Sequence, residues 1–116
     1  MTEQELERAV VEAARLLGWL VAHFRPARTA EGWRTPVAAD GTGFPDLVLA
    51  RPGALVFVEL KATRGRLSEE QSNWLRVLGL TGACDAHVWR PDDWQSGVIE
   101  EVLRTAVAAL EAETGS

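Results

Sequence analysis

The sequence predicts an α/β fold in which a mixed β-sheet is flanked by helices, in the order α-β-β-β-α-β-α. Helical spacing of apolar residues appears near both ends of the chain, and two adjacent apolar runs in the middle have the composition of a hairpin. A third helical segment separates that hairpin from the last strand. With 116 residues, 47% of them hydrophobic and 25% charged, the chain has the size and balance of one domain over residues 1–116.

The first helix has a clear start and stop in the sequence. Thr2 and Glu5 stand three residues apart, as in a capping box, and Gly18 is a typical terminator. Between them, apolar residues recur from Leu6 to Leu17 at the spacing of one helix face. We therefore expect this helix to pack on the sheet.

Three strands are expected next. Residues 19–24 have strand composition, whereas residues 25–45 are rich in glycine and proline and predict a long basic loop. The runs 46–50 and 54–61, separated by Arg51-Pro52-Gly53, predict a hairpin. If Pro52 and Gly53 form its tip, Asp46 faces Glu59. A bulge would shift this pairing by one residue, since Pro-Gly is not the favoured hairpin turn.

The remaining elements follow from capping and spacing. Ser68 and Gln71 predict the start of a second helix, and residues 83–89 a fourth strand, so the helix implies a right-handed parallel crossover. Residues 91–94 are expected to form a turn, residues 98–110 an amphipathic helix and residues 111–116 a frayed tail.

Charge is unevenly distributed along the chain. The net charge of −5 argues against a general nucleic-acid coating protein. Residues 25–66, however, hold seven of the twelve basic residues and only four acids, which makes this segment +3 and the remainder −8. A segment with this charge is expected to contact the phosphate backbone of a nucleic acid. A chance distribution of charged residues over the surface explains the imbalance equally well.

Several features favour a cytoplasmic protein. A single cysteine, Cys84, excludes an intrachain disulfide. The acidic N-terminus lacks the apolar region of a signal peptide, and no apolar run reaches the length of a membrane span.

Asp46, Glu59 and Lys61 are predicted to meet at one end of the sheet. Alternation puts Glu59 and Lys61 on one face, and facing carboxylates repel unless a cation lies between them. Mg²⁺ accepts such a pair with water completing its shell. The chain has eleven arginines and one lysine, and that lysine is Lys61. A position that keeps lysine in such a chain indicates a site that needs a compact ammonium group. The alternative is an exposed Glu-Lys ion pair at a strand end.

These residues carry a resemblance to a known family. Gly43-Phe44-Pro45-Asp46-Leu47 followed by Glu59-Leu60-Lys61 resembles the PD-(D/E)xK nuclease motif, and more specifically the VRR-NUC branch, whose small members are similar to Holliday-junction resolvases. The resemblance extends over residues 3–103 and implies a restriction-endonuclease-like fold in a bacterial or phage setting.

The resemblance also implies the chemistry. Asp46, Glu59 and the Leu60 carbonyl would bind Mg²⁺ or Mn²⁺, while Lys61 would orient the water that attacks a DNA phosphodiester. A first-helix acid would join them, and Glu3 and Glu7 both qualify; both are equally explained as solvated acids at a helix start. Gln71 resembles the family's helix glutamine, and its capping role explains it as well.

The expected substrate is branched DNA such as a Holliday junction. Symmetric cleavage of a four-way junction needs two sites, so we expect a homodimer. DNA-backbone contacts are expected from five arginines, namely Arg25, Arg28, Arg34, Arg64 and Arg66. Two alternatives are a catalytically silent DNA-binding module and a nuclease that needs a partner. Another enzyme class is disfavoured because no glycine-rich phosphate loop, zinc spacing or nucleophile elbow occurs.

Overall fold

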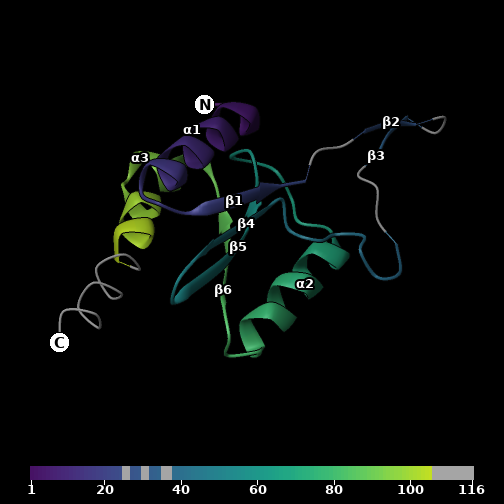
Figure 1. Cartoon of the computed structure of the whole chain (residues 1–116). Coiled ribbons are helices and arrows are strands. Elements are labelled where there is room, and N and C mark those ends of the chain that lie inside the picture. Colours follow the sequence, from purple (N-terminus) through teal and green to yellow (C-terminus); the bar gives the residue numbers. More distant parts are fainter. Residues whose placement is uncertain (25–26, 30–31, 35–37, 106–116) are drawn as a thin grey trace.

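The computed structural model, which describes residues 1–24, 27–29, 32–34 and 38–105, has a four-stranded mixed sheet between helices (Figure 1). The strand order is β1-β4-β5-β6. The first three are antiparallel neighbours, and β5 and β6 are parallel. Their bounds are Leu20–His23, Leu47–Arg51, Ala54–Leu60 and Asp85–Trp89. The predicted α/β class with a parallel crossover is confirmed.

Helix α1 (Glu3–Leu16) starts with the predicted capping box. The Glu5 N–H donates to Thr2 Oγ1 at 3.1 Å, and the Thr2 N–H donates to Glu5 Oε1 at 3.0 Å. At the other end, Arg51 Nη1 donates to the Leu17 carbonyl at 2.7 Å, which satisfies a helix-end acceptor. The capping box thus fixes where the helix starts, and Arg51 ties the end of the helix to the β4–β5 hairpin.

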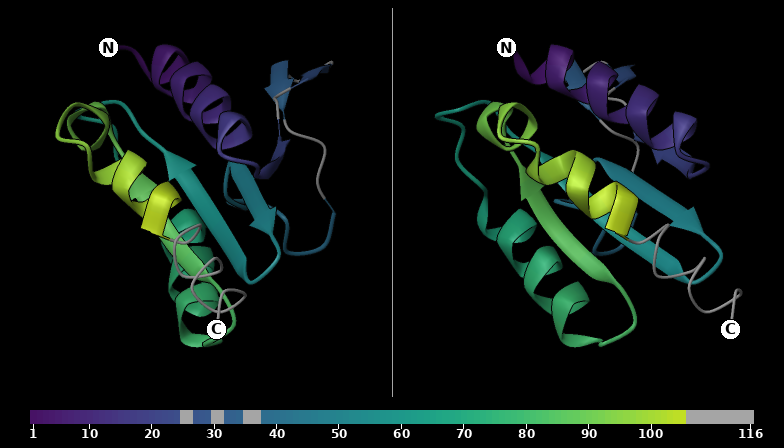
Figure 2. Two further views of the ribbon diagram at one scale, coloured as in Figure 1. Left: turned by 60° about the vertical axis from the view of Figure 1, so that its left-hand side comes forward. Right: turned by 90° about the vertical axis from the view of Figure 1, so that its left-hand side faces the viewer.

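The core lies on the sheet face that α1 covers. Figure 2 shows α1 and the C-terminal helical segment on this side and α2 on the other. Alternate residues of β4 and β5 point into the core, as period-2 geometry requires. The buried apolar residues are Leu6, Val10, Ala14, Trp19, Leu47, Leu49, Val56, Val58, Leu60, Trp89, Ile99 and Leu103.

Helix α2 (Glu69–Leu80) covers the opposite face less completely. Its capping box is formed by Ser68 and Gln71, as predicted, but none of its residues is fully buried. The main contact is aromatic: the Phe44 ring meets the rings of Phe24, Phe57 and Trp74 edge-on, with centroids 5.1–5.9 Å apart. This face is therefore half-buried rather than a second closed core.

Two expectations for the connections are wrong. The predicted loop over residues 25–45 contains a separate two-stranded sheet, β2 (Ala27–Thr29) and β3 (Gly32–Arg34), which extends away from the main sheet in Figure 1. Strands of three residues are too short for their periodicity to show in the sequence. The predicted turn at residues 91–94 is instead the short helix α3 (Pro91–Gln95), because Pro91 occupies a first-turn position that suits proline.

The structure describes only part of the helix predicted over residues 98–110. Residues 98–105 are helical, as expected. The rest of that helix and the predicted tail at residues 111–116 lie outside the described residues. In the part of the chain that the structure describes, no helix is both long and apolar enough to cross a membrane.

Gly43 holds the segment before β4 tightly against α2. Its φ is +84°, and a Cβ there would lie 2.6 Å from the Glu70 carbonyl carbon. Gly43→Ala is therefore expected to lower the free energy of unfolding by about 1–3 kcal/mol, measured by chemical denaturation. Gly79→Ala is the matched control, since nothing lies within 4 Å of its added Cβ. Equal stability of the two variants would contradict this close packing.

Candidate active site

Glu59 is a buried acid at the end of β5. Its side chain is 2% exposed, and Gln71 Nε2 from α2 donates to its Oε1 at 3.0 Å. Its Oε2 is buried and has no hydrogen-bond partner among the described residues. Because an unpaired buried oxygen of this kind is costly, its environment is suited to an added cation.

Asp46 lies beside Glu59 at the start of β4. The observed register pairs Leu47 with Val58 and Arg51 with Ala54, which confirms the predicted hairpin and leads Asp46 toward Glu59. Asp46 Oδ2 accepts the Leu60 N–H at 2.9 Å. Burial, and then the negative charge of Asp46, raises the pKa of Glu59 to about 8. The two carboxyl groups are thus close enough to disfavour double ionisation.

The structure separates the two first-helix acids. The charge of Glu3 contributes to the raised pKa of Glu59, so Glu3 lies in the electrostatic neighbourhood of the carboxylate pair. Glu7 Oε2 instead lies 3.0 Å from His23 Nε2 on β1. Of the two acids, Glu3 is therefore the one whose charge acts on Glu59. The contact between Glu7 and His23 has no signal in the sequence, because it joins residues sixteen positions apart on different elements.

The Leu60 carbonyl lacks one ladder bond in the pairing of β4 and β5. Leu60 donates its N–H toward Asp46, and the carbonyl of an extended residue points to the same side of the strand as its N–H. Continuing the register by two pairs beyond Leu47 and Val58 places Pro45 opposite Leu60. Proline has no N–H to donate, so the ladder bond that this carbonyl would accept cannot form.

Lys61 lies on the same strand face as Glu59 and is half-buried. Its N–H donates to the Trp89 carbonyl at 3.0 Å, which ties the residue to the end of β6. The positive charge of Lys61 lowers the pKa of Glu59, against the larger opposing effects. In the described part of the chain, no ion pair joins Glu59 to Lys61, so the simple surface ion pair is not what the fold forms.

The predicted DNA-contacting arginines fall in two groups. Arg64 and Arg66 are exposed between β5 and α2, next to the site. Arg25 lies outside the described residues. Arg28 is on β2 and Arg34 on β3, and their side chains are outside the description.

The donor set fits an ion that takes few protein ligands. Within the described ranges, no group of three or more His, Cys, Asp or Glu side chains is gathered for metal binding. Two neighbouring carboxylates, with no histidine or cysteine of the described residues beside them, are an oxygen-donor set, which suits Mg²⁺ or Mn²⁺ rather than zinc. The unpartnered Glu59 Oε2 is the observation that supports this fit.

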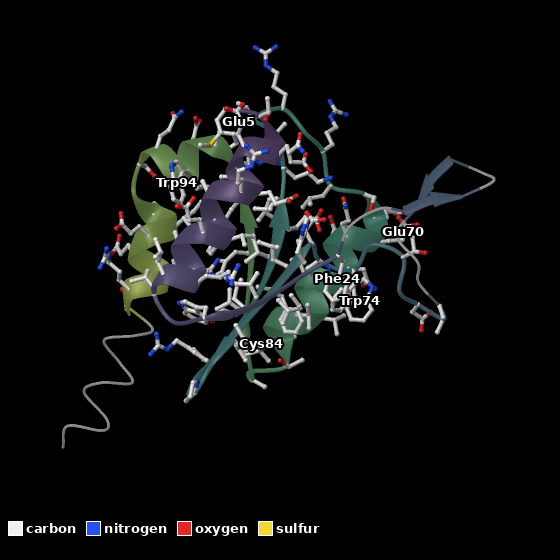
Figure 3. The ribbon with its side chains drawn as sticks, turned by 45° about the horizontal axis from the view of Figure 1, so that its top comes forward. Glu5, Phe24, Glu70, Trp74, Cys84 and Trp94 are labelled. Carbon is white, nitrogen blue, oxygen red and sulfur yellow. The ribbon has the colours of Figure 1, made fainter. Side chains whose placement is uncertain are left out.

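The aromatic contacts beside the site hold α2 in place. Figure 3 shows Phe24 next to Trp74 over α2, and the Phe44 ring contacts both. Trp74 Nε1 donates to the Asp40 carbonyl at 2.9 Å. These tryptophan and phenylalanine contacts are packing contacts, and they fix the helix from which Gln71 reaches Glu59.

A mixed sheet flanked by helices, with Asp46 beside Glu59 at the end of its two central strands, has the architecture of the restriction-endonuclease-like fold. Comparison with known families agrees, because the VRR-NUC domain matches residues 4–90. The chain therefore belongs to the VRR-NUC family, as the sequence motif indicated.

The chain was also compared with solved structures and with curated proteins. A solved structure of Archaeoglobus fulgidus Hjc, a Holliday junction resolvase from an archaeal hyperthermophile, superposes with a TM-score of 0.47 at 18% identity. The similarity covers 75% of this chain and 67% of that one. No curated protein matches the sequence.

Proposed function

We propose that this protein is a metal-dependent DNA endonuclease in which Asp46 and Glu59 bind Mg²⁺ or Mn²⁺. The observation that carries the proposal is the buried Glu59 Oε2, which has no hydrogen-bond partner among the described residues and lies beside a second carboxylate. When bound, the ion supplies Lewis-acid activation of water and neutralises charge on the phosphate. The Leu60 carbonyl, which lacks a ladder bond opposite Pro45, is the third protein ligand.

The position of each remaining site residue suggests its role. Gln71 holds Glu59 Oε1, which leaves Oε2 for the ion. Lys61 presents its ammonium on the face that Glu59 occupies, where it orients the attacking water and stabilises the developing negative charge on the phosphate. Glu3 adds negative charge to the ion-binding region. Glu7 has no direct part in this scheme, because it contacts His23.

The proposed substrate is branched DNA, with the Holliday junction as the leading candidate, and the proposed assembly is a homodimer. Membership of the VRR-NUC family supports the nuclease class, and the need for two cuts in a symmetric junction supports two subunits. Arg64 and Arg66 lie beside the site to contact the backbone, and we include Arg25, Arg28 and Arg34 of the basic segment in the same role.

A cleavage assay tests the function. Four-way junction, flap, single-stranded and linear duplex DNA are incubated with the protein and Mg²⁺ or Mn²⁺, with a chelator control. We expect cutting of at least one branched substrate, abolished by chelation. Binding without cutting on every substrate would favour the silent DNA-binding module, and activity that appears only after an added partner would favour a partner-dependent nuclease.

The arginine contacts give a separate prediction. Replacing both Arg64 and Arg66 with alanine is expected to weaken DNA binding and to flatten the slope of log affinity against log salt by about 2, because two phosphate contacts are lost. Fluorescence anisotropy over a salt series measures both. Arg104→Ala is the control, since Arg104 pairs with Glu100 on the C-terminal helical segment. An unchanged slope in the double variant would contradict the assignment.

A further inference from the structure

Arg90 uses its guanidinium to hold the turn that follows Lys61. Its Nη1 donates to the carbonyls of Ala62 and Gly65, each at 2.7 Å, and approaches that of Thr63 at 3.5 Å. All three acceptors lie in one four-residue turn, closed by the Gly65 N–H donating to the Ala62 carbonyl at 3.0 Å. One side chain therefore determines where this turn sits relative to β6.

The turn packs against the Lys61 side chain. A Cβ placed on Gly65 would lie 3.3 Å from Lys61 Cδ, closer than ordinary van der Waals contact, and 3.4 Å from the Ala62 N and O atoms. Glycine thus lets the backbone approach the lysine stem directly. The aliphatic part of the Lys61 side chain is therefore flanked by the 62–65 turn, which Arg90 holds in position.

Arg90 is itself held rigidly. Its N–H donates to Asp93 Oδ2 at 2.8 Å, and its carbonyl accepts the Asp93 N–H at 2.9 Å, so its backbone forms the start of α3. The preceding residue, Trp89, accepts the Lys61 N–H. Among the described residues, no carboxylate forms an ion pair with the Arg90 guanidinium, whose hydrogen bonds go to backbone carbonyls.

We propose that Arg90 is a positioning residue for Lys61. It anchors the 62–65 turn to the end of β6, and the turn limits the directions open to the lysine stem, so that the ammonium stays on the Glu59 face. The inference rests on the proposed function, in which Lys61 acts in phosphodiester cleavage. In the described part of the chain, no hydrogen bond joins the Arg90 guanidinium to Asp46 or Glu59, and Arg90 acts on Lys61 through the turn.

The kinetic test compares two arginines that both bind backbone carbonyls. Arg90→Ala is expected to lower kcat about 10- to 100-fold with little change in KM for DNA, since misplacing a reacting group by about 1 Å has such effects. Arg51→Ala is the matched control, because Arg51 donates to the Leu17 carbonyl at 2.7 Å from the hairpin end away from the site. Arg90→Lys, which retains a multiple donor, is expected to recover part of kcat.

A second readout is independent of activity and uses the only lysine in the chain. With lysine labelled at ¹³Cε, Lys61 alone gives the ε-methylene signal, and a held side chain gives its two protons distinct shifts. We expect them to merge in Arg90→Ala and to stay distinct in Arg51→Ala. Separate shifts retained in Arg90→Ala, or a wild-type kcat for it, would overturn the inference. If the wild-type protein cuts no DNA but the signals merge, the proposed function fails and the positioning survives.

Discussion

Lys61→Arg is expected to slow DNA cleavage about 100- to 1,000-fold, the scale of losing one donor that stabilises transition-state charge. Arginine keeps the positive charge, but its planar guanidinium is larger and essentially never gives up a proton. The site offers little room for it, because the 62–65 turn packs on the lysine stem. The other eleven of the twelve basic residues are arginines. We therefore expect position 61 to be the basic position where arginine works least well.

The measurement is single-turnover cleavage of the best substrate, alongside DNA affinity by anisotropy. Lys61→Ala is run in parallel and should be equally slow, while binding of DNA should change little in either variant. Arg76→Lys on the exposed side of α2 serves as the matched control, since Arg76 donates to Asn73 Oδ1 within the same helix. A Lys61→Arg enzyme of wild-type speed would mean that only charge is needed at this position.

Glu59→Gln is expected to stabilise the metal-free protein, by about 2–3 kcal/mol near pH 7. Burial and the charge of Asp46 raise the pKa of Glu59 from an ordinary value of 4.5 to about 8. Between these values the folded protein holds a proton that the unfolded chain has released. Glu59 therefore destabilises the fold increasingly as pH rises from about 4.5 to about 8, and the penalty is absent below that window. Glutamine is neutral and similar in shape, so it removes the penalty.

Chemical denaturation with a chelator at pH 5, 7 and 9 checks this result. The wild-type free energy of unfolding should fall more steeply with pH than that of Glu59→Gln, and the difference between the two should be smallest at pH 5. Glu12→Gln on the exposed side of α1 is the matched control and should follow the wild type. Added Mg²⁺ should stabilise the wild type and Glu12→Gln but not Glu59→Gln. Parallel pH curves for wild type and Glu59→Gln would show that Glu59 is not strained by burial and Asp46.

The sequence was sufficient for elements whose determinants are local. Both capping boxes, the hairpin register and the buried face of α1 follow from residues a few positions apart. The convergence of Asp46 and Glu59 was also predictable, because it needs only the hairpin turn and strand alternation. Membership of the VRR-NUC family rests on the same residues and is confirmed.

The features that sequence reasoning missed depend on long-range contacts or on very short elements. Arg90 reaches a turn that precedes it by about 25 residues, and nothing in its neighbours indicates which carbonyls it binds. The choice between Glu3 and Glu7 depends on the angle of α1 over the sheet, since both lie on one helix face. The β2–β3 hairpin was not predicted, because strands of three residues are too short to show a periodic pattern of apolar residues.

Binding of Mn²⁺ is the decisive measurement, because the proposed active site needs Asp46 and Glu59 to hold a divalent ion. The free Mn²⁺ signal is measured by electron paramagnetic resonance as protein is added in the presence of uncleavable DNA, for wild type, Asp46→Asn, Glu59→Gln and Glu12→Gln. We expect wild type and Glu12→Gln to deplete the free Mn²⁺ signal beyond DNA alone, and the two site variants not to do so. Equal depletion by wild type and Glu59→Gln, or none by the wild type, would contradict this expectation.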